Sequence, residues 1–480
     1  MIIEWQPDRS KNESIKHQIF KYFIERIASG DWLLGAKLPS ERRLSEQLAV
    51  NRSTISTVLD ELKAEGVLES RGSKGTFVVN NSWSVLSLSN RTNWEKYITN
   101  SVHMPNHKII QKINHYEFKK GIIRLGTGEL APGLFPKDLT DEVMREVTKG
   151  LYSLNYVHPL GIQELRTMIC NHLKKYSLDV NENQILITSG ALQGLHLIAL
   201  GLLEPGSTVF VEQPSYLKSL HVFQSTGMKL EGIPITEDCL DLENLRSKIN
   251  KSKSNLFYTI PSFNNPTSIT MDQEKREALM ELVNEYRIPV IEDDVYRELW
   301  IDKEPPMPLK SMDVNGNVLY MGSLSKSFSP GLRIGWLVGP SAVVERLGDI
   351  KMQIDYGSSS LSQYFALEWF RGGFNDVFQK RLRDILEKKR DFTLKVLENH
   401  FGDLCRWKRP KGGFYIWVEL NNEIDMEVLF HEALKHNILI NIGSIYDFKK
   451  NNAIRISYAY ASEEEIEKGI EILSQLIRKI

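Results

Sequence analysis

The sequence predicts an α/β protein in which an N-terminal winged helix-turn-helix precedes a larger domain built on a mostly parallel central sheet. Its 480 residues exceed the length of one ordinary domain. Residues 1–80 carry closely spaced helical patterns that end in a glycine-rich hairpin. Residues 121–480 alternate strand-like runs with amphipathic helices, which is typical of an α/β domain. Five short apolar runs are predicted to be strands: 185–190, 208–214, 256–262, 288–294 and 318–323. Residues 81–120 are rich in Ser, Asn and Thr and are predicted to form a linker.

The overall composition excludes several classes of protein. With 41% hydrophobic and 25% charged residues the chain is neither disordered nor fibrous, and a net charge of -1 requires any DNA contact to come from a local patch. Cys170, Cys239 and Cys405 share no metal-ligand spacing, so we expect reduced thiols and no metal site. The N-terminus has no apolar signal core, and residues 195–203 are too short to span a bilayer. We therefore expect a cytoplasmic protein with no membrane association.

The first 80 residues have the spacing of a helix-turn-helix. A first helix, ended by Gly30, is indicated by apolar residues at every fourth position: Ile15, Ile19, Phe23 and Ile27. Ser40 is placed to cap a second helix, and a tight turn follows at residues 49–51. A third helix, which ends at Gly66, turns four apolar residues inward: Ile55, Val58, Leu59 and Leu62. Two short helices joined by such a turn place the second of them in the major groove of DNA.

The polar residues of this motif are candidates for contact with double-stranded DNA. Those at the start of the third helix face the groove, those on the second helix straddle the backbone, and those at the hairpin tip reach phosphate or the minor groove. In that order they are Asn51, Arg52, Ser53 and Thr54, then Arg42 and Arg43, then Arg71 and Lys74. Residues 31–80 hold as many acidic as basic side chains, so their charge does not exclude the alternative, a small protein-interaction module.

The order of the short motifs favours DNA binding. The motifs LPSERRLSEQL, NRSTI, LKAEGVL and SKGTF occur in this order along the chain. The stretch resembles the GntR family of winged-helix regulators, and this resemblance implies a DNA-binding head.

One lysine of the larger domain lies in a setting suited to covalent chemistry. The segment GSLSKSFSPGLRIGW places Lys326 among hydroxyls after a strand-like run, with Arg333 seven residues further on. A lysine amine forms a Schiff base with an aldehyde cofactor, and Ser323 and Arg333 are donors suited to a phosphate dianion. The glycine-rich turn SGALQG at 189–194 presents further backbone N–H groups to a phosphate. The alternatives are a solvated surface lysine and an ordinary turn.

Two further motifs suit the ring of the same cofactor. In EDDVY, Asp293 is placed to meet a pyridine nitrogen and keep it protonated, which makes the ring an electron sink. Tyr296 and Asn265, the latter from NPT, suit the ring's phenolic oxygen. Three adjacent acids leave the choice among them open, and Asn-Pro is also a plain turn.

Three more residues are candidates for the site. Tyr216, in QPSY, is suited to stack on a pyridine ring or to fill a core. Tyr156 lies in a loop before a helix. Arg455, on a late strand, is a bidentate carboxylate clamp if it faces a pocket and a solubilising residue if it faces solvent.

The series SGALQG, PSY, NPT, DDVY, SLSK, GLRIGW and IRIS resembles the fold-type-I aminotransferases, which depend on pyridoxal 5′-phosphate. The resemblance implies a fold-type-I transferase-like domain with a small C-terminal α+β subdomain. It implies that Lys326 forms the internal aldimine and that Asp293 pairs with the pyridine nitrogen. It further implies that Tyr296 and Asn265 bind the phenolic oxygen and that Tyr216 stacks on the ring.

The same resemblance implies how phosphate and effector are held. The phosphate ligands are the backbone at Ala191 and Leu192, the side chains of Ser323 and Arg333, and Tyr156 from a partner subunit. Arg455 is implied to bind the carboxylate of an amino compound. One departure from the family pattern is Ser268, which stands where a glycine is usual after NPT.

A GntR-like head joined to an aminotransferase-like body resembles the MocR/GabR subfamily of GntR-type regulators. The resemblance implies a homodimeric transcription regulator that binds promoter DNA. It senses an amino-acid-like compound or amine through an external aldimine at Lys326, or it senses pyridoxal phosphate itself. The alternative is an active aminotransferase whose head is a localisation or dimerisation module, and slow transamination is chemically compatible with Asp293. A body without cofactor would predict the loss of Lys326, Asp293 or Arg333, and none is lost.

Overall fold

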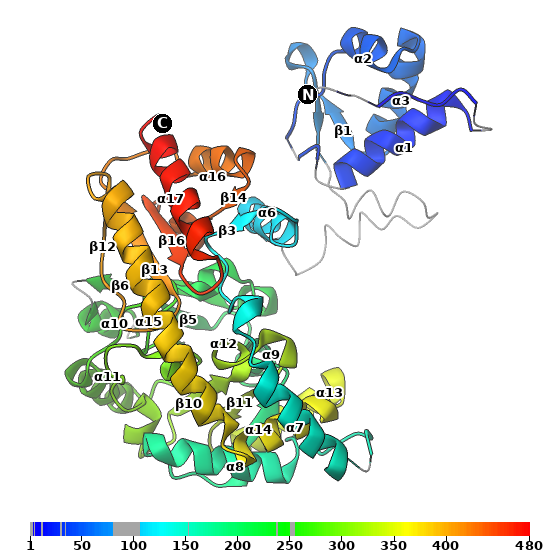
Figure 1. Ribbon diagram of the computed structural model, residues 1–480. Coiled ribbons are helices and arrows are strands. Elements are labelled where there is room, and N and C mark those ends of the chain that lie inside the picture. Colours follow the sequence, from blue (N-terminus) through cyan, green and yellow to red (C-terminus); the bar gives the residue numbers. More distant parts are fainter. Residues whose placement is uncertain are drawn as a thin grey trace. The chain divides into compact units, whose positions relative to one another are not determined.

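In the computed structural model the chain forms two units, Met1–Val102 and His103–Ile480 (Figure 1). The structure describes residues 3, 5–10, 13–28, 31–33, 35–79, 106–151, 153–236, 239–249 and 255–480. We call the described part of the first unit the head and the described part of the second unit the body.

The head is the predicted winged helix-turn-helix. Its elements are α1 (Ile15–Ala28), α2 (Glu41–Leu48), α3 (Arg52–Ala64) and an antiparallel pair, β1 (Leu68–Ser70) and β2 (Thr76–Val78). Ser40 caps α2 by accepting the N–H of Arg43 at 3.4 Å, and Ala49 ends this helix in the left-handed conformation. The apolar faces predicted for the first and third helices meet in one buried core. Gly30, the predicted end of the first helix, lies outside the described residues.

The body is built on an eight-stranded sheet with the order β4-β11-β10-β9-β8-β5-β6-β7. Its strands are β4 (Ile185–Thr188), β5 (Thr208–Gln213), β6 (Lys229–Thr236), β7 (Cys239–Leu240), β8 (Asn255–Thr259), β9 (Val290–Asp293), β10 (Val318–Ser323) and β11 (Gly335–Val338). The five strands from β10 to β6 in this order run parallel to one another, whereas β11 and β7 run antiparallel to their neighbours. The five strands predicted from the sequence, β4, β5, β8, β9 and β10, are therefore confirmed.

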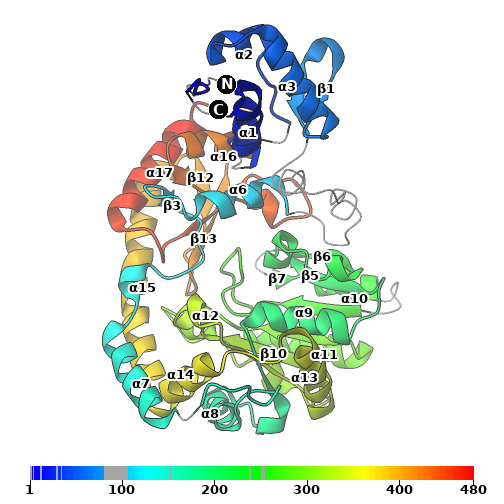
Figure 2. The same ribbon diagram turned by 90° about the vertical axis from the view of Figure 1, so that its right-hand side faces the viewer.

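Helices surround this sheet (Figure 2). They are α7 (Lys137–Gly150), α8 (Gln163–Leu173), α9 (Ala191–Gly201), α10 (Leu242–Ile249), α11 (Gln273–Tyr286), α12 (Leu324–Ser327), α13 (Ser341–Asp355) and α14 (Ser360–Arg371). Helix α9 packs on α13, and α14 packs on α7 and α8. The short α12 follows β10 directly and carries Lys326.

A second, four-stranded sheet with the order β12-β13-β16-β15 forms the predicted C-terminal α+β subdomain. Its elements are α15 (Phe374–Phe401), β12 (Cys405–Trp407), β13 (Tyr415–Leu420), α16 (Met426–Lys435), β14 (Ile438–Leu439), β15 (Asn441–Ile442), β16 (Ala453–Ser457) and α17 (Glu463–Ile477). The long α15 runs from the end of the body that holds α14 to this subdomain (Figures 1 and 2). Strand β14 also pairs in parallel with β3 (Ile123–Arg124), so the start of the body is tied to its C-terminal part.

The C-terminal end of the predicted linker is structured. Residues 81–105 lie outside the described residues, but α6 (Lys108–Tyr116) occupies most of the remainder of the stretch 81–120. Ile109 and Ile113 are one helical turn apart and both are buried. The polar composition around this helix concealed a short apolar stripe, and the boundary between linker and body at residue 120 stays a prediction.

Within the described ranges, no helix combines the length and the apolar character that crossing a membrane requires.

We expect Phe23→Ala to destabilise the head by about 3–5 kcal/mol, because this change removes a fully buried ring from its core. The Phe23 and Trp32 ring centroids lie 4.7 Å apart. Head and body have separate apolar cores, so calorimetry of the full chain should show an earlier transition of the head and an unchanged transition of the body. Leu33→Ala is the control, since a side chain 43% exposed should cost less than about 0.5 kcal/mol. Equal shifts of both transitions in Phe23→Ala would contradict the independence of the two cores.

Candidate cofactor site and candidate DNA-contact surface

Lys326 and Asp293 come together at one edge of the central sheet. Strands β9 and β10 are parallel neighbours in which Asp293 pairs with Met321, so both strands end at the same edge. Helix α12 begins at Leu324, directly after β10, and holds Lys326 half-buried at that edge. Lys326 Nζ donates a hydrogen bond of 2.6 Å to the carbonyl oxygen of Gly128.

Asp293 is buried and has one carboxylate oxygen unused. Its Oδ2 accepts a hydrogen bond of 2.6 Å from the hydroxyl of Tyr258 on β8. Its Oδ1 is buried and has no hydrogen-bond partner among the described residues. Burial raises the pKa of Asp293 to about 6. A buried acceptor of this kind is matched by a donor such as a protonated ring nitrogen, because an unsatisfied buried oxygen is costly.

The two neighbouring acids are engaged elsewhere. Glu292 accepts the backbone N–H groups of Leu309 and Lys310, each at 2.8 Å. Asp294 forms a buried ion pair with Arg297. Both neighbouring acids thus have partners within the body, and the assignment of Asp293 to a ring nitrogen remains a prediction.

The two residues suited to a phenolic oxygen lie side by side. Asn265 Nδ2 donates to the hydroxyl oxygen of Tyr296 at 3.4 Å, and that hydroxyl lies 3.2 Å from the hydroxyl of Tyr415. Tyr216 is half-buried nearby, and its backbone N–H donates to the carbonyl oxygen of Asn265 at 3.1 Å. Burial raises the pKa of Tyr216, so its ring is a neutral phenol at physiological pH.

Arg455 faces the interior and not the solvent. It lies on β16, is only 5% exposed, and donates 2.7 Å hydrogen bonds to Asn265 Oδ1 and to the carbonyl oxygen of Gly126. Its guanidinium lies 4.0 Å and 4.8 Å from the ring centroids of Tyr415 and Tyr446. The N–H at Nε is buried and has no partner among the described residues. This unused donor suits an oxygen of an incoming carboxylate.

The predicted phosphate ligands surround the start of α9. Gly190 precedes Ala191 with φ of 83°, and a Cβ at this position would collide with the guanidinium of Arg333. Arg333 Nη2 donates to the carbonyl oxygen of Ser189 at 2.7 Å. The N–H groups at the start of this helix, including those of Ala191 and Leu192, have no partner within the helix and favour an anion. Ser323 caps α12 by accepting the N–H of Ser325 at 3.0 Å, and its phosphate contact remains a prediction.

Two other sequence-based expectations concern Tyr156 and Ser268. Tyr156 is 82% exposed, and its ring centroid lies 4.8 Å from that of Tyr356. Its role as a phosphate ligand in the site of a partner subunit remains a prediction. Ser268 adopts the left-handed φ of 58° that favours glycine. Its hydroxyl donates to the carbonyl oxygen of Tyr415 at 2.7 Å, which offsets part of the conformational cost.

Sequence reasoning missed several residues that complete this cluster. Tyr258, Tyr415 and Tyr446 contact Asp293 or Arg455, and Gly126 and Gly128 supply the carbonyl groups that hold Arg455 and Lys326. The only local signals are the GTG triplet at 126–128 and the GG pair before Phe414 and Tyr415.

These residues fit pyridoxal 5′-phosphate. Asp293 Oδ1 offers an acceptor for a protonated pyridine nitrogen, Lys326 offers an amine, and the start of α9 with Arg333 offers donors for a phosphate. Among the described residues, no group of three or more His, Cys, Asp or Glu side chains is arranged to hold a metal ion.

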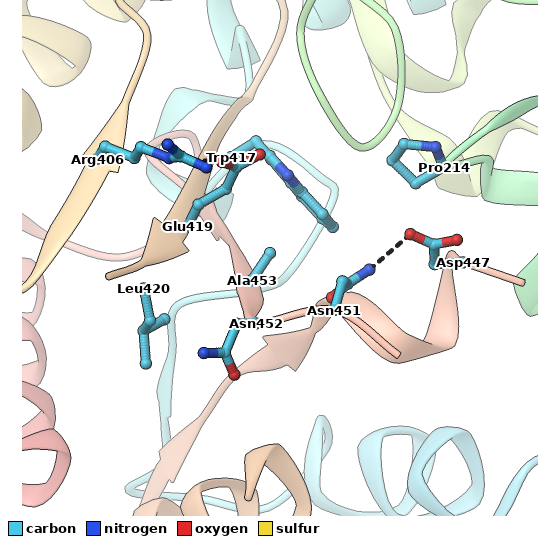
Figure 3. Close-up of a pocket in the computed structure, with 9 residues that line it drawn as sticks. All are labelled: Pro214, Arg406, Trp417, Glu419, Leu420, Asp447, Asn451, Asn452 and Ala453. Carbon is cyan, nitrogen blue, oxygen red and sulfur yellow. Dashed lines mark hydrogen bonds and ion pairs between the residues drawn. The ribbon is translucent and has the colours of Figure 1, made fainter. Parts of the chain in front are cut away.

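A separate pocket of about 280 Å³ lies beside β13 and the segment before β16 (Figure 3). It is lined by Pro214, Arg406, Trp417, Glu419, Leu420, Asp447, Asn451, Asn452 and Ala453. Glu419 pairs with Arg406 at 2.9 Å, and Asp447 accepts hydrogen bonds from Gln213 and Asn451 at 2.7 Å and 2.9 Å. Its carboxylates are thus occupied, and the lining contains none of the predicted cofactor residues.

The predicted DNA contacts of the head lie on its surface. Arg42, Arg43, Asn51, Arg52, Ser53, Arg71 and Lys74 are exposed, and Thr54 is half-buried. Asn51 precedes α3 without a side-chain cap bond, which leaves its amide available. Three arginines have nearby carboxylates: Arg42 with Glu46, Arg52 with Glu41 and Arg71 with Glu69. Exposed pairs of this kind contribute less than about 1 kcal/mol, so a phosphate can displace the carboxylate.

The fold and this arrangement of side chains define the body as an aminotransferase-like α/β protein. Comparisons with known proteins agree. Residues 120–473 match the family "Aminotransferase class I and II", and residues 15–78 match the family "Bacterial regulatory proteins, gntR family". An archaeal alanine:glyoxylate aminotransferase structure is 31% identical with a TM-score of 0.76, over 81% of this chain and 100% of that one. Kynurenine aminotransferase of Pyrococcus horikoshii, solved with PMP, is 30% identical with a TM-score of 0.75, over 82% and 98%.

Two relatives match nearly the whole chain, head included. YdfD of Bacillus subtilis, an HTH-type transcriptional regulator, is 46% identical over 476 residues, which is 99% of both chains. NorG of Staphylococcus aureus, also an HTH-type transcriptional regulator, is 32% identical over 447 residues, 92% of this chain and 100% of NorG. The chain therefore belongs to the GntR-type transcriptional regulators that carry an aminotransferase class I and II domain, the MocR/GabR arrangement. The alternative of a plain aminotransferase with an accessory head is not favoured, because these whole-length relatives are regulators.

We expect Asp293→Asn to weaken the binding of pyridoxal phosphate about 10- to 100-fold, since a hydrogen bond to a charged group contributes about 1.5–3 kcal/mol. Absorbance titration of the purified full chain measures the affinity. The pKa of Asp293 is about 6, so the ratio of wild-type to variant affinity should narrow as the pH falls below that value. An equal ratio at pH 5 and pH 8 would contradict an ionised Asp293 as the ring's partner.

Without cofactor, ionisation of Asp293 destabilises the fold, whereas with cofactor the ionised form strengthens binding. The folded state holds the Asp293 proton more tightly than the unfolded state, whose pKa is about 4, so the free energy of unfolding falls as pH rises from about 4 to about 6. Asp293→Asn should remove this part of the pH dependence.

Proposed function

We propose that this regulator binds pyridoxal phosphate in its body and changes its affinity for promoter DNA when an amino compound bearing a carboxylate enters the site. One observation carries the proposal: a single buried cluster holds Lys326, the unused oxygen of Asp293 and the unused N–H of Arg455. Unpaired polar groups are costly in a protein interior, and a bound cofactor and a carboxylate would give both of these atoms a partner.

Each residue has a defined task in this proposal. Pyridoxal phosphate supplies, when bound, an aldehyde carbon that condenses with primary amines. Lys326 provides the amine that tethers the cofactor, and Asp293 accepts the proton of its ring nitrogen. Arg333 and the first N–H groups of α9 bind its phosphate, while Tyr216 lies against its ring and Tyr296 with Asn265 binds its phenolic oxygen.

Arg455 selects the effector. Its guanidinium is already oriented by Asn265 Oδ1, so little further ordering is needed when a carboxylate arrives. The carboxylate competes with the carbonyl oxygen of Gly126, which now accepts a hydrogen bond from Nη2. The effector class is therefore an amino acid and not a simple alkylamine. The other effector considered, pyridoxal phosphate alone, requires no contact with Arg455.

We also propose a homodimer in which the second copy covers an apolar patch around Tyr156. Four large apolar side chains of the 151–160 loop and the end of α13 are more than half exposed: Leu154, Tyr156, Ile354 and Tyr356. Exposed apolar groups of this kind are typical of protein–protein interfaces. A second copy placed there brings Tyr156 towards the neighbouring site, the role implied by the resemblance to aminotransferases. A target on chromosomal DNA supports a cytoplasmic location.

The proposal is tested by binding of the purified full chain to its own upstream DNA and to unrelated DNA at one fixed salt concentration, because phosphate contacts alone give salt-sensitive binding. The measurement is made with and without pyridoxal phosphate and with a panel of amino acids and amines. The proposal is supported if the chain binds its own upstream DNA specifically and if an amino acid changes this affinity only when pyridoxal phosphate is present. Equal affinity for both DNAs under all conditions excludes it.

We expect Arg52→Ala to weaken binding to the specific site by about 1–3 kcal/mol and binding to unrelated DNA much less, as for a base-contacting arginine. Lys21→Ala, an exposed charge outside the predicted contact set, is the control and should change neither affinity. Fluorescence anisotropy with both DNAs measures the difference. A uniform loss on both DNAs would make Arg52 a phosphate contact instead.

We expect Lys326→Ala to keep DNA binding but to abolish the response to amino acids, because the covalent tether of the cofactor is lost. Lys303→Ala, which removes an exposed lysine of the body, is the matched control and should respond as the wild type does. A reporter gene and the anisotropy assay report the response. An unchanged response in Lys326→Ala would exclude a switch based on displacement of this lysine.

A further inference from the structure

The hydroxyl of Tyr415 and the amine of Lys326 both lie near Gly128. A Cβ added to Gly128 would overlap the Tyr415 hydroxyl and would lie 3.7 Å from Lys326 Nζ, so both groups face the same side of this glycine. Lys326 Nζ is itself hydrogen-bonded to the carbonyl oxygen of Gly128. A carbonyl oxygen accepts a hydrogen bond but does not exchange protons at neutral pH, whereas a hydroxyl both donates and accepts.

Tyr415 is linked to the effector arginine through hydrogen bonds as well as through space. Arg455 Nη1 donates to Asn265 Oδ1, and Asn265 Nδ2 donates to the hydroxyl of Tyr296. That hydroxyl lies 3.2 Å from the hydroxyl of Tyr415, whose ring is packed under the Arg455 guanidinium. Tyr415 is therefore connected to Arg455 in two ways, by a chain of hydrogen bonds through Asn265 and Tyr296 and by direct packing. Its hydroxyl is also near Gly128, the residue to which Lys326 is hydrogen-bonded.

The surroundings favour proton exchange by Tyr415 over its neighbours. Burial alone would raise the pKa of Tyr415, but the charges of Arg455 and Lys326 and the hydrogen bond from Tyr296 lower it overall. Burial raises the pKa of Tyr296 well above its usual range, so Tyr296 remains the donor of the shared hydrogen bond. Of the other groups that act on the same cluster, Asp293 is held by Tyr258, Tyr446 accepts from Asn441, and Glu117 accepts from Thr127.

We propose that the Tyr415 hydroxyl carries protons between an incoming amine and Lys326 Nζ when that amine displaces the lysine. The proposal rests on the proposed cofactor site. In the exchange, the incoming nitrogen bonds to the aldehyde-derived carbon of the cofactor, and the bond between that carbon and Nζ breaks. The incoming nitrogen loses two protons and Nζ gains two. Tyr415 Oη relays both protons, and each one that it accepts from the incoming nitrogen it delivers to Nζ, so the exchange balances and no oxidant or reductant is involved.

The test is the rate at which methoxyamine, a small neutral amine, displaces Lys326 in the cofactor-loaded full chain. Stopped-flow absorbance of the bound cofactor follows this exchange directly, without any turnover. Tyr415→Phe removes only the hydroxyl, and we expect it to slow displacement about 100-fold, the lower range of general acid–base catalysis. Its affinity for the cofactor and for DNA should stay within about threefold of wild type, and its displacement rate should vary less with pH than that of wild type.

Tyr458→Phe is the matched control. Tyr458 is an equally buried phenol of the same subdomain, and its hydroxyl is bonded to the carbonyl oxygens of Gly412 and Gly413, at 3.2 Å and 2.7 Å, and not to a predicted cofactor residue. Its displacement rate should equal that of wild type. Equal slowing in both variants, or a rate in Tyr415→Phe within threefold of wild type, would overturn the proposal.

A second variant covers the case in which Tyr415→Phe binds the cofactor poorly. Tyr415→His keeps an exchangeable proton and should move the inflection of the rate profile towards the ordinary histidine pKa of about 6.5. An inflection that does not move would overturn the proposal. If wild type itself shows no cofactor absorbance that methoxyamine changes, the proposed function fails first, and the two failures are thus distinguishable.

Discussion

The parallel pairing of β8, β9 and β10 is the constraint on which the rest of the body depends. Their shared register brings the end of β9 beside the end of β10, and α12 starts at that point with Lys326. Strand β8 supplies Tyr258 to Asp293 from the other side. Because side chains alternate along a strand, a slip of one residue would turn Asp293 away from Lys326 and expose Glu292 or Asp294 in its place. The chemistry at this edge is therefore a consequence of strand register.

Buried charge is the second organising factor. Removing a charge from water is costly, so each buried ion in this body has a partner, and the partners decide which groups remain free. Arg297 forms an ion pair with Asp294, and two backbone N–H groups donate hydrogen bonds to Glu292. Arg455 is packed between two tyrosine rings and hydrogen-bonded at both terminal nitrogens. Asp293 Oδ1 and Arg455 Nε are among the buried atoms that have no hydrogen-bond partner in the described residues, and both lie in the cluster proposed to hold a cofactor and a carboxylate.

The sequence predicted those features that depend on local pattern. The helix-turn-helix, the five strands and the residues at their ends all follow from periodicity and turn chemistry. The sequence did not predict a role for Tyr415, because that role arises from contact with Tyr296, 119 residues away, and with Arg455 on the neighbouring strand. The partners of Glu292 and Asp294 were likewise not visible in the sequence, because they come from segments further along the chain. Helix α6 was missed because two buried isoleucines in a polar stretch are too few to show a periodicity.

Three consecutive residues connect the site to the start of the body. The carbonyl oxygen of Gly126 holds Arg455, the carbonyl oxygen of Gly128 holds Lys326, and the Thr127 hydroxyl between them donates to Glu117 at 2.9 Å, just after α6. In the proposed function, effector binding takes Arg455 from Gly126 and displaces Lys326, so both outer contacts of this segment change together. A change from 1:99 to 99:1 between two states requires about 5.5 kcal/mol of differential binding, more than one such hydrogen bond contributes. In this proposal the effector acts on both ends of the segment at once, with its amine at Lys326 and its carboxylate at Arg455.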